Sequence, residues 1–91
     1  MNSTVELTLS GRVQGVGMRF FINRTATRFG ITGYVKNLYN NNVLAVIQGE
    51  QKILDNFIEY IKRNSPGVID NIAYNQLNTE VVYRKFNVKI F

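Results

Sequence analysis

The chain has 91 residues, which suits one small domain, and 45% of them are apolar, which excludes a disordered segment. It has no cysteine and no histidine, so disulfides, thiolate nucleophiles, zinc fingers and histidine-based metal or nucleophile sites are excluded. Eleven Lys and Arg against six Asp and Glu give a net charge of +5, which favours anionic partners.

The sequence shows no membrane or export signal. No apolar run approaches the roughly 20 residues that a bilayer-spanning helix needs. The N-terminus lacks the basic start and apolar stretch of a signal peptide. We therefore expect a cytoplasmic protein without membrane association, consisting of a single domain over residues 1–91.

The first third of the chain predicts a strand, a glycine-containing loop and a helix. Val5, Leu7 and Leu9 alternate with polar residues, as in a strand with one buried face. The loop at 11–17 follows, and the helix is expected to end at Gly30, which stands at the C-cap position. The positions that recur at helical spacing are Met18, Phe21, Ile22, Thr25 and Phe29.

Two strands and a turn are predicted for the middle of the chain. Residues 31–38 and 43–48 have strand character. The YNNN segment at 39–42 is a turn between them, because asparagine tolerates left-handed backbone angles. The segment at 43–48, VLAVIQ, is almost continuously apolar, which favours a central place in the sheet.

The second helix has the clearest pattern, and two strands follow it. Its apolar stripe consists of Ile53, Leu54, Phe57, Ile58 and Ile61. The sequence Asn-Ser-Pro-Gly at 64–67 ends this helix. Residues 68–77 are predicted as a fourth, less regular strand, and residues 81–91 as a fifth.

The element order is therefore β-α-β-β-α-β with an extra terminal strand. Packing both helices on one face of a single sheet buries both apolar stripes. We predict an α+β fold of the ferredoxin-like split βαβ type, a sandwich in which two helices cover one face of an antiparallel sheet of four to five strands. Many activities share this fold, so the function has to be argued from the site.

The segment GRVQGVGMR, residues 11–19, predicts a phosphate site. A loop that leaves a strand and enters a helix has backbone N–H groups without internal partners, and these groups attract anions together with the helix dipole. Gly15 and Gly17 allow backbone angles that point several N–H groups inward. Arg19 falls at the start of the helix, where its guanidinium can bind two phosphate oxygens.

The glycine spacing alone leaves two interpretations open. It matches neither G-x-G-x-x-G nor G-x-x-x-x-G-K-[ST], so dinucleotide-binding and Walker-type loops are excluded. The loop is either a phosphate cradle of another kind or a glycine-containing turn beside an ordinary surface arginine.

Two motifs resemble those of the acylphosphatase family. GRVQGVGMR resembles the family's G-x-V-Q-G-V-x-F/M-R motif. GYVKN at 33–37 resembles the family's second motif, which is glycine, an aromatic residue, valine, a variable residue and asparagine. The separation of the two motifs also matches, and the resemblance covers essentially the whole chain. It implies an enzyme that hydrolyses acyl phosphates without a metal or cofactor.

The resemblance also implies roles for individual residues. Arg19 would bind the phosphoryl group and Asn37 would position the attacking water. The phosphate would be bound by the backbone amides of Gly15, Val16, Gly17, Met18 and Arg19. Met18 replaces the commoner phenylalanine, and Leu38 stands where some members carry threonine, which leaves an extra hydroxyl contact to the asparagine in doubt.

The other polar and aromatic residues suggest structural roles. The acidic residues do not cluster, which disfavours metal-dependent and phosphoaspartate phosphatases. Arg12, Arg24 and Arg28 are interpreted as solvated charges that add to the positive field. The ring of Tyr34 is assigned to the core or rim. Gly33 is expected to allow a bulge or a close backbone approach that aims the asparagine of its motif.

The expected partners are small molecules. They are an acyl phosphate as substrate and inorganic phosphate as product and competitive inhibitor. No metal, cofactor or nucleic acid is expected. Nothing in the sequence indicates an obligate interface, so a monomer is expected.

Two alternative functions are compatible with the predicted fold. One is a non-catalytic nucleic-acid-binding module, but such modules stack bases on aromatic residues of the third strand, and 43–48 has none. The other is a phosphate-carrying domain like that of hydrogenase-maturation carbamoyltransferases. Those proteins continue into cysteine-rich zinc segments, whereas this chain has no cysteine. A free-standing enzyme is therefore favoured.

Overall fold

Strands and helices follow one another in the predicted order in a computed structural model, which describes residues 2–90. The strands are β1 (Asn2–Arg12), β2 (Thr32–Asn37), β3 (Val43–Glu50), β4 (Val68–Leu77) and β5 (Phe86–Lys89). The helices are α1 (Met18–Phe29) and α2 (Gln51–Asn64). The β-α-β-β-α-β order with an additional terminal strand is thus confirmed.

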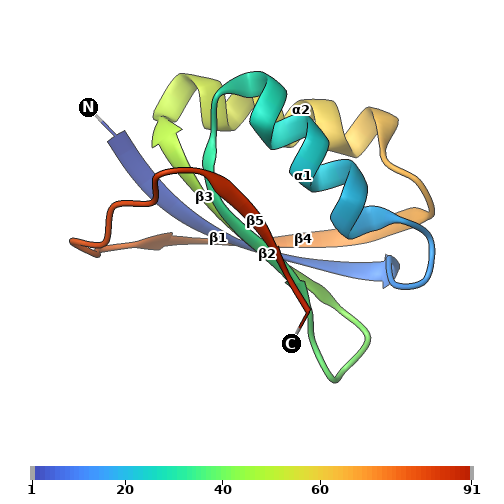
Figure 1. Cartoon of the computed structure of the whole chain (residues 1–91). Coiled ribbons are helices and arrows are strands. Elements are labelled where there is room, and N and C mark those ends of the chain that lie inside the picture. Colours follow the sequence, from blue (N-terminus) through green and yellow to red (C-terminus); the bar gives the residue numbers. More distant parts are fainter. Residues whose placement is uncertain (1, 91) are drawn as a thin grey trace.

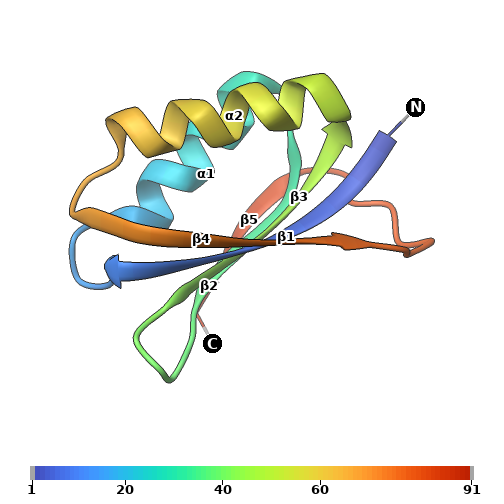
Figure 2. The same cartoon turned by 180° about the vertical axis from the view of Figure 1, so that it is seen from behind.

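The strands form one sheet in the order β4-β1-β3-β2-β5. The strand β3 is central, as its apolar sequence predicted. It pairs antiparallel with β1 and β2, and β4 pairs antiparallel with β1. Both helices cover the same face of the sheet, and the other face is uncovered in both views (Figures 1 and 2). This arrangement is the predicted ferredoxin-like sandwich.

The core lies between the helices and the covered face of the sheet. Leu54, Phe57 and Ile61 of α2 are fully buried there. Phe29 of α1 packs edge-on against Phe57, with 5.9 Å between the ring centroids. Ile53 was assigned to the apolar stripe of this helix, but 36% of it is exposed. The stripe is therefore narrower than the sequence pattern indicates.

The C-terminal strand differs from the expectation in length and direction. It covers Phe86–Lys89 rather than 81–91, and the last residue of the predicted strand lies outside the described residues. It pairs parallel with β2, so the sheet is mixed rather than wholly antiparallel. The strand order explains both differences: β4 and β5 lie at opposite edges, so residues 78–85 cross the end of the sheet before pairing begins (Figure 1).

The buried side chain of Gln48 holds this crossing segment in place. Its Nε2 atom donates a hydrogen bond to the Val81 carbonyl oxygen, and its Oε1 atom accepts one from the Tyr83 amide, both at 2.8 Å. These two backbone groups therefore have a side-chain partner in place of a neighbouring strand. That is the local reason why the predicted strand is shortened.

Gly33 lies where β2 passes very close to β3. Its φ is +138°, and a Cβ atom at this position would overlap the carbonyl oxygen of Val46. The predicted close backbone approach is therefore present. It allows the second sequence motif to lie flat against the central strand, with its asparagine at the strand end.

Replacing Gly33 with alanine is expected to destabilise the fold. The strained backbone angle alone costs about 1–3 kcal/mol for a residue with a side chain, and the overlap with β3 adds to this. Denaturant unfolding of Gly33→Ala measures the loss. Gly30→Asn is the control, because its φ is +76° but its Cβ would meet nothing within 4 Å, and asparagine tolerates this conformation. Equal losses in the two variants would contradict the overlap.

Candidate active site

The loop between β1 and α1 has the geometry of an anion-binding nest. Gly15 and Gly17 have φ values of +73° and +84°, and Gly17 caps the N-terminus of α1. The first turn of the helix carries no acidic residue. Among the backbone hydrogen bonds of turns, loops and helix caps within residues 2–90, none is donated by an amide of residues 15–19. An anion at this helix end would satisfy free donors and complement the helix dipole.

Arg19 and Asn37 line one hollow of about 440 Å³ together with the loop. Gly15, Gly17 and Met18 also line it, so four of the five residues predicted to supply amides reach the same space. Val16 lines a neighbouring hollow, and its side chain packs partly against the core. The two predicted side chains, from different elements, thus line the same hollow.

Arg19 is held by a neutral acceptor. Its Nη1 atom donates a hydrogen bond to the carbonyl oxygen of Lys89 at 3.3 Å. In the described part of the chain the one ion pair joins Lys62 and Glu59, so no carboxylate neutralises this arginine. Its positive charge and most of its five N–H donors therefore stay available to an anionic ligand.

Asn37 stands at the end of β2, where that strand leaves the sheet. It pairs with Val43 of β3, which fixes its backbone in the sheet, and its side chain is half-buried. The pairing partner is fully buried. A carboxamide carried on such a rigid strand can hold a water molecule in a fixed orientation, because it offers both a donor and an acceptor.

Gln14 is a residue of the site to which the sequence analysis gave no role. Its Nε2 atom donates hydrogen bonds to the carbonyl oxygens of Leu38 and Asn42, both at 2.8 Å. It therefore ties the nest to the turn that directly follows Asn37. The sequence contained one indication of this role. Gln14 stands between Val13, which is buried, and Gly15, and a polar side chain next to the core is usually hydrogen-bonded.

Removing the carboxamide of Gln14 is expected to loosen the site. In Gln14→Ala the two carbonyls lose their link to the loop but keep their backbone donors, the amides of Asn41 and Leu38. The stability lost is therefore that of two ordinary hydrogen bonds, about 0.5–1.5 kcal/mol each. The kcat should fall by up to about 10²-fold, because a misplacement of about 1 Å has that effect. Steady-state kinetics and denaturant unfolding measure both effects. Gln76→Ala on the exposed edge strand β4 is the control, and equal behaviour of the two variants would contradict the link.

The aromatic residue of the second motif lies away from the hollow. The ring of Tyr34 packs against Tyr83, with centroids 5.9 Å apart, and the Nζ atom of Lys89 lies 3.9 Å from its centroid. Partial burial, with smaller contributions from Tyr83 and Glu6, raises the pKa of its hydroxyl. The assignment of this ring to a structural position agrees with these contacts.

The other arginines near the loop do not reach into the hollow. The guanidinium of Arg24 lies over the ring of Phe20, 5.3 Å from its centroid. Arg28 donates a hydrogen bond to the hydroxyl of Tyr60 at 2.8 Å. Arg12 is exposed at the end of β1. None of the three lines the hollow at the nest, which agrees with their interpretation as surface charges.

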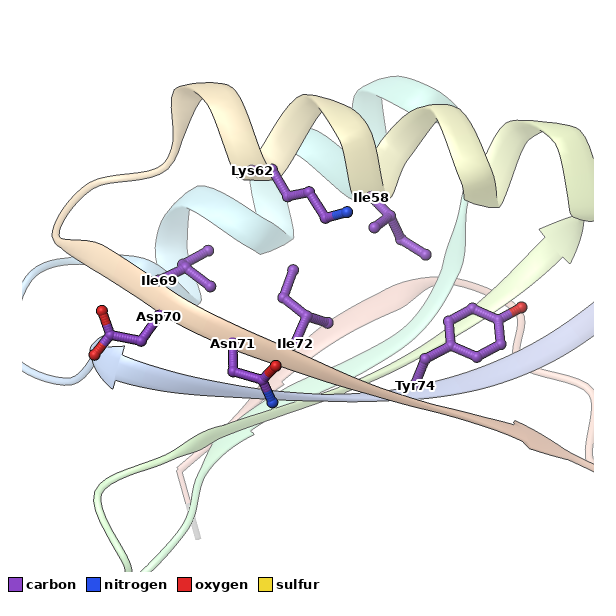
Figure 3. A pocket seen from close by; sticks show the side chains of 7 residues that line it. All are labelled: Ile58, Lys62, Ile69, Asp70, Asn71, Ile72 and Tyr74. Atoms are coloured by element: carbon purple, nitrogen blue, oxygen red, sulfur yellow. The ribbon is translucent and has the colours of Figure 1, made fainter.

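A second hollow, of about 400 Å³, lies between α2 and β4 (Figure 3). It contains one cation, Lys62, which already pairs with Glu59 at 3.2 Å. Asp70 also lines it and would repel an anion. This hollow has neither a glycine loop nor a helix N-terminus, so it lacks the features of a phosphate site.

The described residues show neither a metal-binding cluster nor a membrane-spanning helix. Residues 2–90 contain no group of three or more Asp or Glu side chains placed to hold a metal ion. No helix in this range is both long and apolar enough to cross a membrane.

The fold and the hollow define a class of protein. It is a ferredoxin-like α+β domain in which a strand-to-helix nest, an arginine and an asparagine face one space. The loop and the arginine suit the binding of a phosphoryl group. The asparagine adds a neutral carboxamide next to that group.

Comparisons with known proteins identify the family. The family model described as Acylphosphatase matches residues 5–88. An acylphosphatase of Caldanaerobacter subterraneus subsp. tengcongensis is 36% identical over 97% of this chain and 99% of its own length. The crystal structure of acylphosphatase from Bacillus subtilis has a TM-score of 0.90 at 28% identity, and the match covers 98% of this chain and 99% of that one. The chain belongs to the acylphosphatase family, as the two motifs predicted.

The same fold also occurs inside a larger protein. A full-length HypF in its phosphate- and nucleotide-bound form matches 98% of this chain with a TM-score of 0.87 and 28% identity, but only 12% of that chain is covered. Curated acylphosphatases are enzymes, and the matches to them support an acylphosphatase over a non-catalytic nucleic-acid-binding module.

Proposed function

We propose that this protein hydrolyses the carboxyl-phosphate bond of acyl phosphates. The main support is that Arg19, Asn37 and the glycine loop line the same hollow. The amides of Gly15, Val16, Gly17, Met18 and Arg19 form the phosphate-binding loop and hold the phosphoryl oxygens together with the arginine guanidinium. These donors act most strongly where charge builds up in the transition state.

Asn37 positions the water that attacks phosphorus. Its carboxamide holds the water in line with the bond that breaks. The water oxygen forms the new P–O bond, the P–O bond to the acyl group breaks with its electron pair going to the carboxylate, and the water proton passes to a phosphoryl oxygen. Because a carboxylate leaves readily, the reaction requires no histidine or other strong general acid. The products are a carboxylate and inorganic phosphate.

The proposed function also concerns the location, the oligomeric state and the partners of the protein. The protein works as a cytoplasmic monomer, its residues 1–91 form one acylphosphatase-like domain, and it uses neither a metal nor an organic cofactor. Its partners are small molecules, namely an acyl phosphate and inorganic phosphate. The positive net charge of +5 supports an anionic substrate. Nucleic acid is not a partner in this proposal.

Inorganic phosphate is expected to inhibit competitively, because it occupies the same nest as the phosphoryl group of the substrate. Initial rates of acetyl phosphate hydrolysis, measured with a chelator at several phosphate concentrations, test this. The apparent KM should rise with phosphate while kcat stays constant. Sulfate, which has the same tetrahedral shape, should act in the same way, and chloride at equal ionic strength is the control. A fall in kcat at constant KM would contradict a shared site.

A further inference from the structure

We propose that Phe20, Val88 and Ile90 form an apolar wall that binds the acyl group, so that the enzyme prefers acyl phosphates with an extended apolar acyl chain or an aromatic ring. The inference rests on the proposed function, because it concerns the part of the substrate that the phosphate nest does not hold. None of these three residues is part of the nest or of the pair of Arg19 and Asn37.

Exposed apolar side chains gather at this hollow. Phe20 is 65% exposed, Val88 38% and Ile90 82%, and all three line the same space of about 440 Å³. Side chains of this kind cost free energy in water, and a contiguous apolar patch on a small protein marks a binding surface. Their position around the phosphate nest indicates a ligand with one anionic end and one apolar end.

The direction of β5 creates this wall. Val88 pairs with Val35 in the parallel register of β2 and β5, so both side chains point to the helix-covered face. Ile90 is two residues further on and points the same way. Continuing the register by one pair beyond Lys36 and Lys89 brings Ile90 level with Asn37. The strand therefore places its apolar residues beside the proposed reaction centre.

Phe20 completes the wall from the helix side. It lies in the first turn of α1, directly after Arg19, and its ring is supported by the guanidinium of Arg24 at 5.3 Å from the centroid. This ring also lines the next hollow, which it shares with Gly17. An acyl group that extends from the nest thus meets an aromatic ring from α1 and the aliphatic side chains of Val88 and Ile90.

The size of the hollow also exceeds that of a phosphoryl group. Small-molecule sites are clefts of about 300–1,000 Å³, apolar for the most part, with a few polar groups that fix the orientation. The hollow of about 440 Å³ falls in this range. Its polar part is the nest with Arg19 and Asn37, and its apolar part is the wall.

A series of acyl phosphates tests the proposal. The kcat/KM is measured for acetyl, butyryl, hexanoyl and benzoyl phosphate with a chelator present. Each methylene that the wall covers is expected to raise kcat/KM by about two- to fourfold, where the upper value corresponds to complete burial at about 0.8 kcal/mol. Benzoyl phosphate should exceed acetyl phosphate by at least tenfold. Phenylphosphonate should likewise inhibit more strongly than methylphosphonate.

Single substitutions then assign the selectivity to the wall. In Ile90→Ser, Val88→Thr and Phe20→Ser the ratio of kcat/KM for hexanoyl to acetyl phosphate should fall by about threefold or more, since each change removes apolar contact area. Val82→Ser is the matched control, because Val82 is 75% exposed, belongs to the crossing segment at 78–85 and does not line the hollow. Its ratio should equal that of the unmodified protein.

The outcomes separate this inference from the proposed function. Hydrolysis of all four substrates with equal kcat/KM would overturn the acyl wall and leave the acylphosphatase activity standing. A selectivity that Val82→Ser lowers as much as Ile90→Ser would also overturn it. Absence of turnover with every substrate would overturn the proposed function, and the inference with it.

Discussion

Replacing Arg19 with glutamine is expected to reduce kcat/KM for acyl phosphates by on the order of 10³–10⁵, the effect of an arginine that stabilises a transferring phosphoryl group. Glutamine keeps a polar side chain of similar reach but removes the charge and the two-pronged contact with oxygen. The guanidinium has no carboxylate partner among the described residues, so its charge is directed at the ligand. Assays with benzoyl phosphate measure the loss.

The fold should tolerate this change. Among the described residues, the guanidinium of Arg19 donates one hydrogen bond, to the Lys89 carbonyl; it is long at 3.3 Å and exposed, so its loss costs at most about 1 kcal/mol. Circular dichroism and denaturant unfolding would verify a folded Arg19→Gln protein. Arg28→Gln is the matched control, because Arg28 lies on the same helix and contacts Tyr60 instead of the hollow. A folded Arg19→Gln protein with normal turnover would refute the assigned role.

Replacing Asn37 with alanine is expected to lower kcat by about 10²-fold or more, the typical effect of misplacing a reacting group. The KM should change little, because the nest and Arg19 still hold the phosphoryl group. The substitution removes the carboxamide and keeps the backbone pairing with Val43 that fixes the strand end. Steady-state kinetics with acetyl and benzoyl phosphate separate the effects on kcat and KM.

The matched control for this variant is Asn75→Ala. Asn75 lies on the exposed edge strand β4, away from the hollow, and its removal should leave kcat and KM unchanged. Inorganic phosphate should inhibit Asn37→Ala as strongly as the unmodified protein, since the nest is intact. If Asn37→Ala lost phosphate affinity and kept kcat, the residue would be a phosphate ligand and would not position the water.

Much of the fold was predictable because local patterns and packing agree. Apolar side chains lie on one face of β1 and on one face of α2, so each element can bury them in one orientation only. These side chains are Val5, Leu7 and Leu9 in β1 and Leu54, Phe57 and Ile61 in α2. Two such helices and one sheet face leave few possible arrangements. The left-handed backbone of the loop was predictable for a related reason, since Gly15 and Gly17 stand at a strand-to-helix junction in the sequence itself.

Contacts between distant segments were harder to predict. The parallel pairing of β5 depends on which edge of the sheet remains free, and no local pattern carries that information. The role of Gln14 depends on two carbonyls that lie 24 and 28 residues away. The place of Val88 and Ile90 in the proposed acyl wall depends in turn on the direction of β5. The structure was needed for each of these features.

We propose that this chain cleaves a carboxyl-phosphate bond with only the glycine loop, Arg19 and Asn37. The most direct test is the hydrolysis of benzoyl phosphate by the purified protein in the presence of a chelator, with the release of benzoate and phosphate followed together. We expect rapid turnover that releases equal amounts of the two products and that the chelator does not affect. No turnover above the spontaneous rate, or turnover that the chelator abolishes, would contradict it.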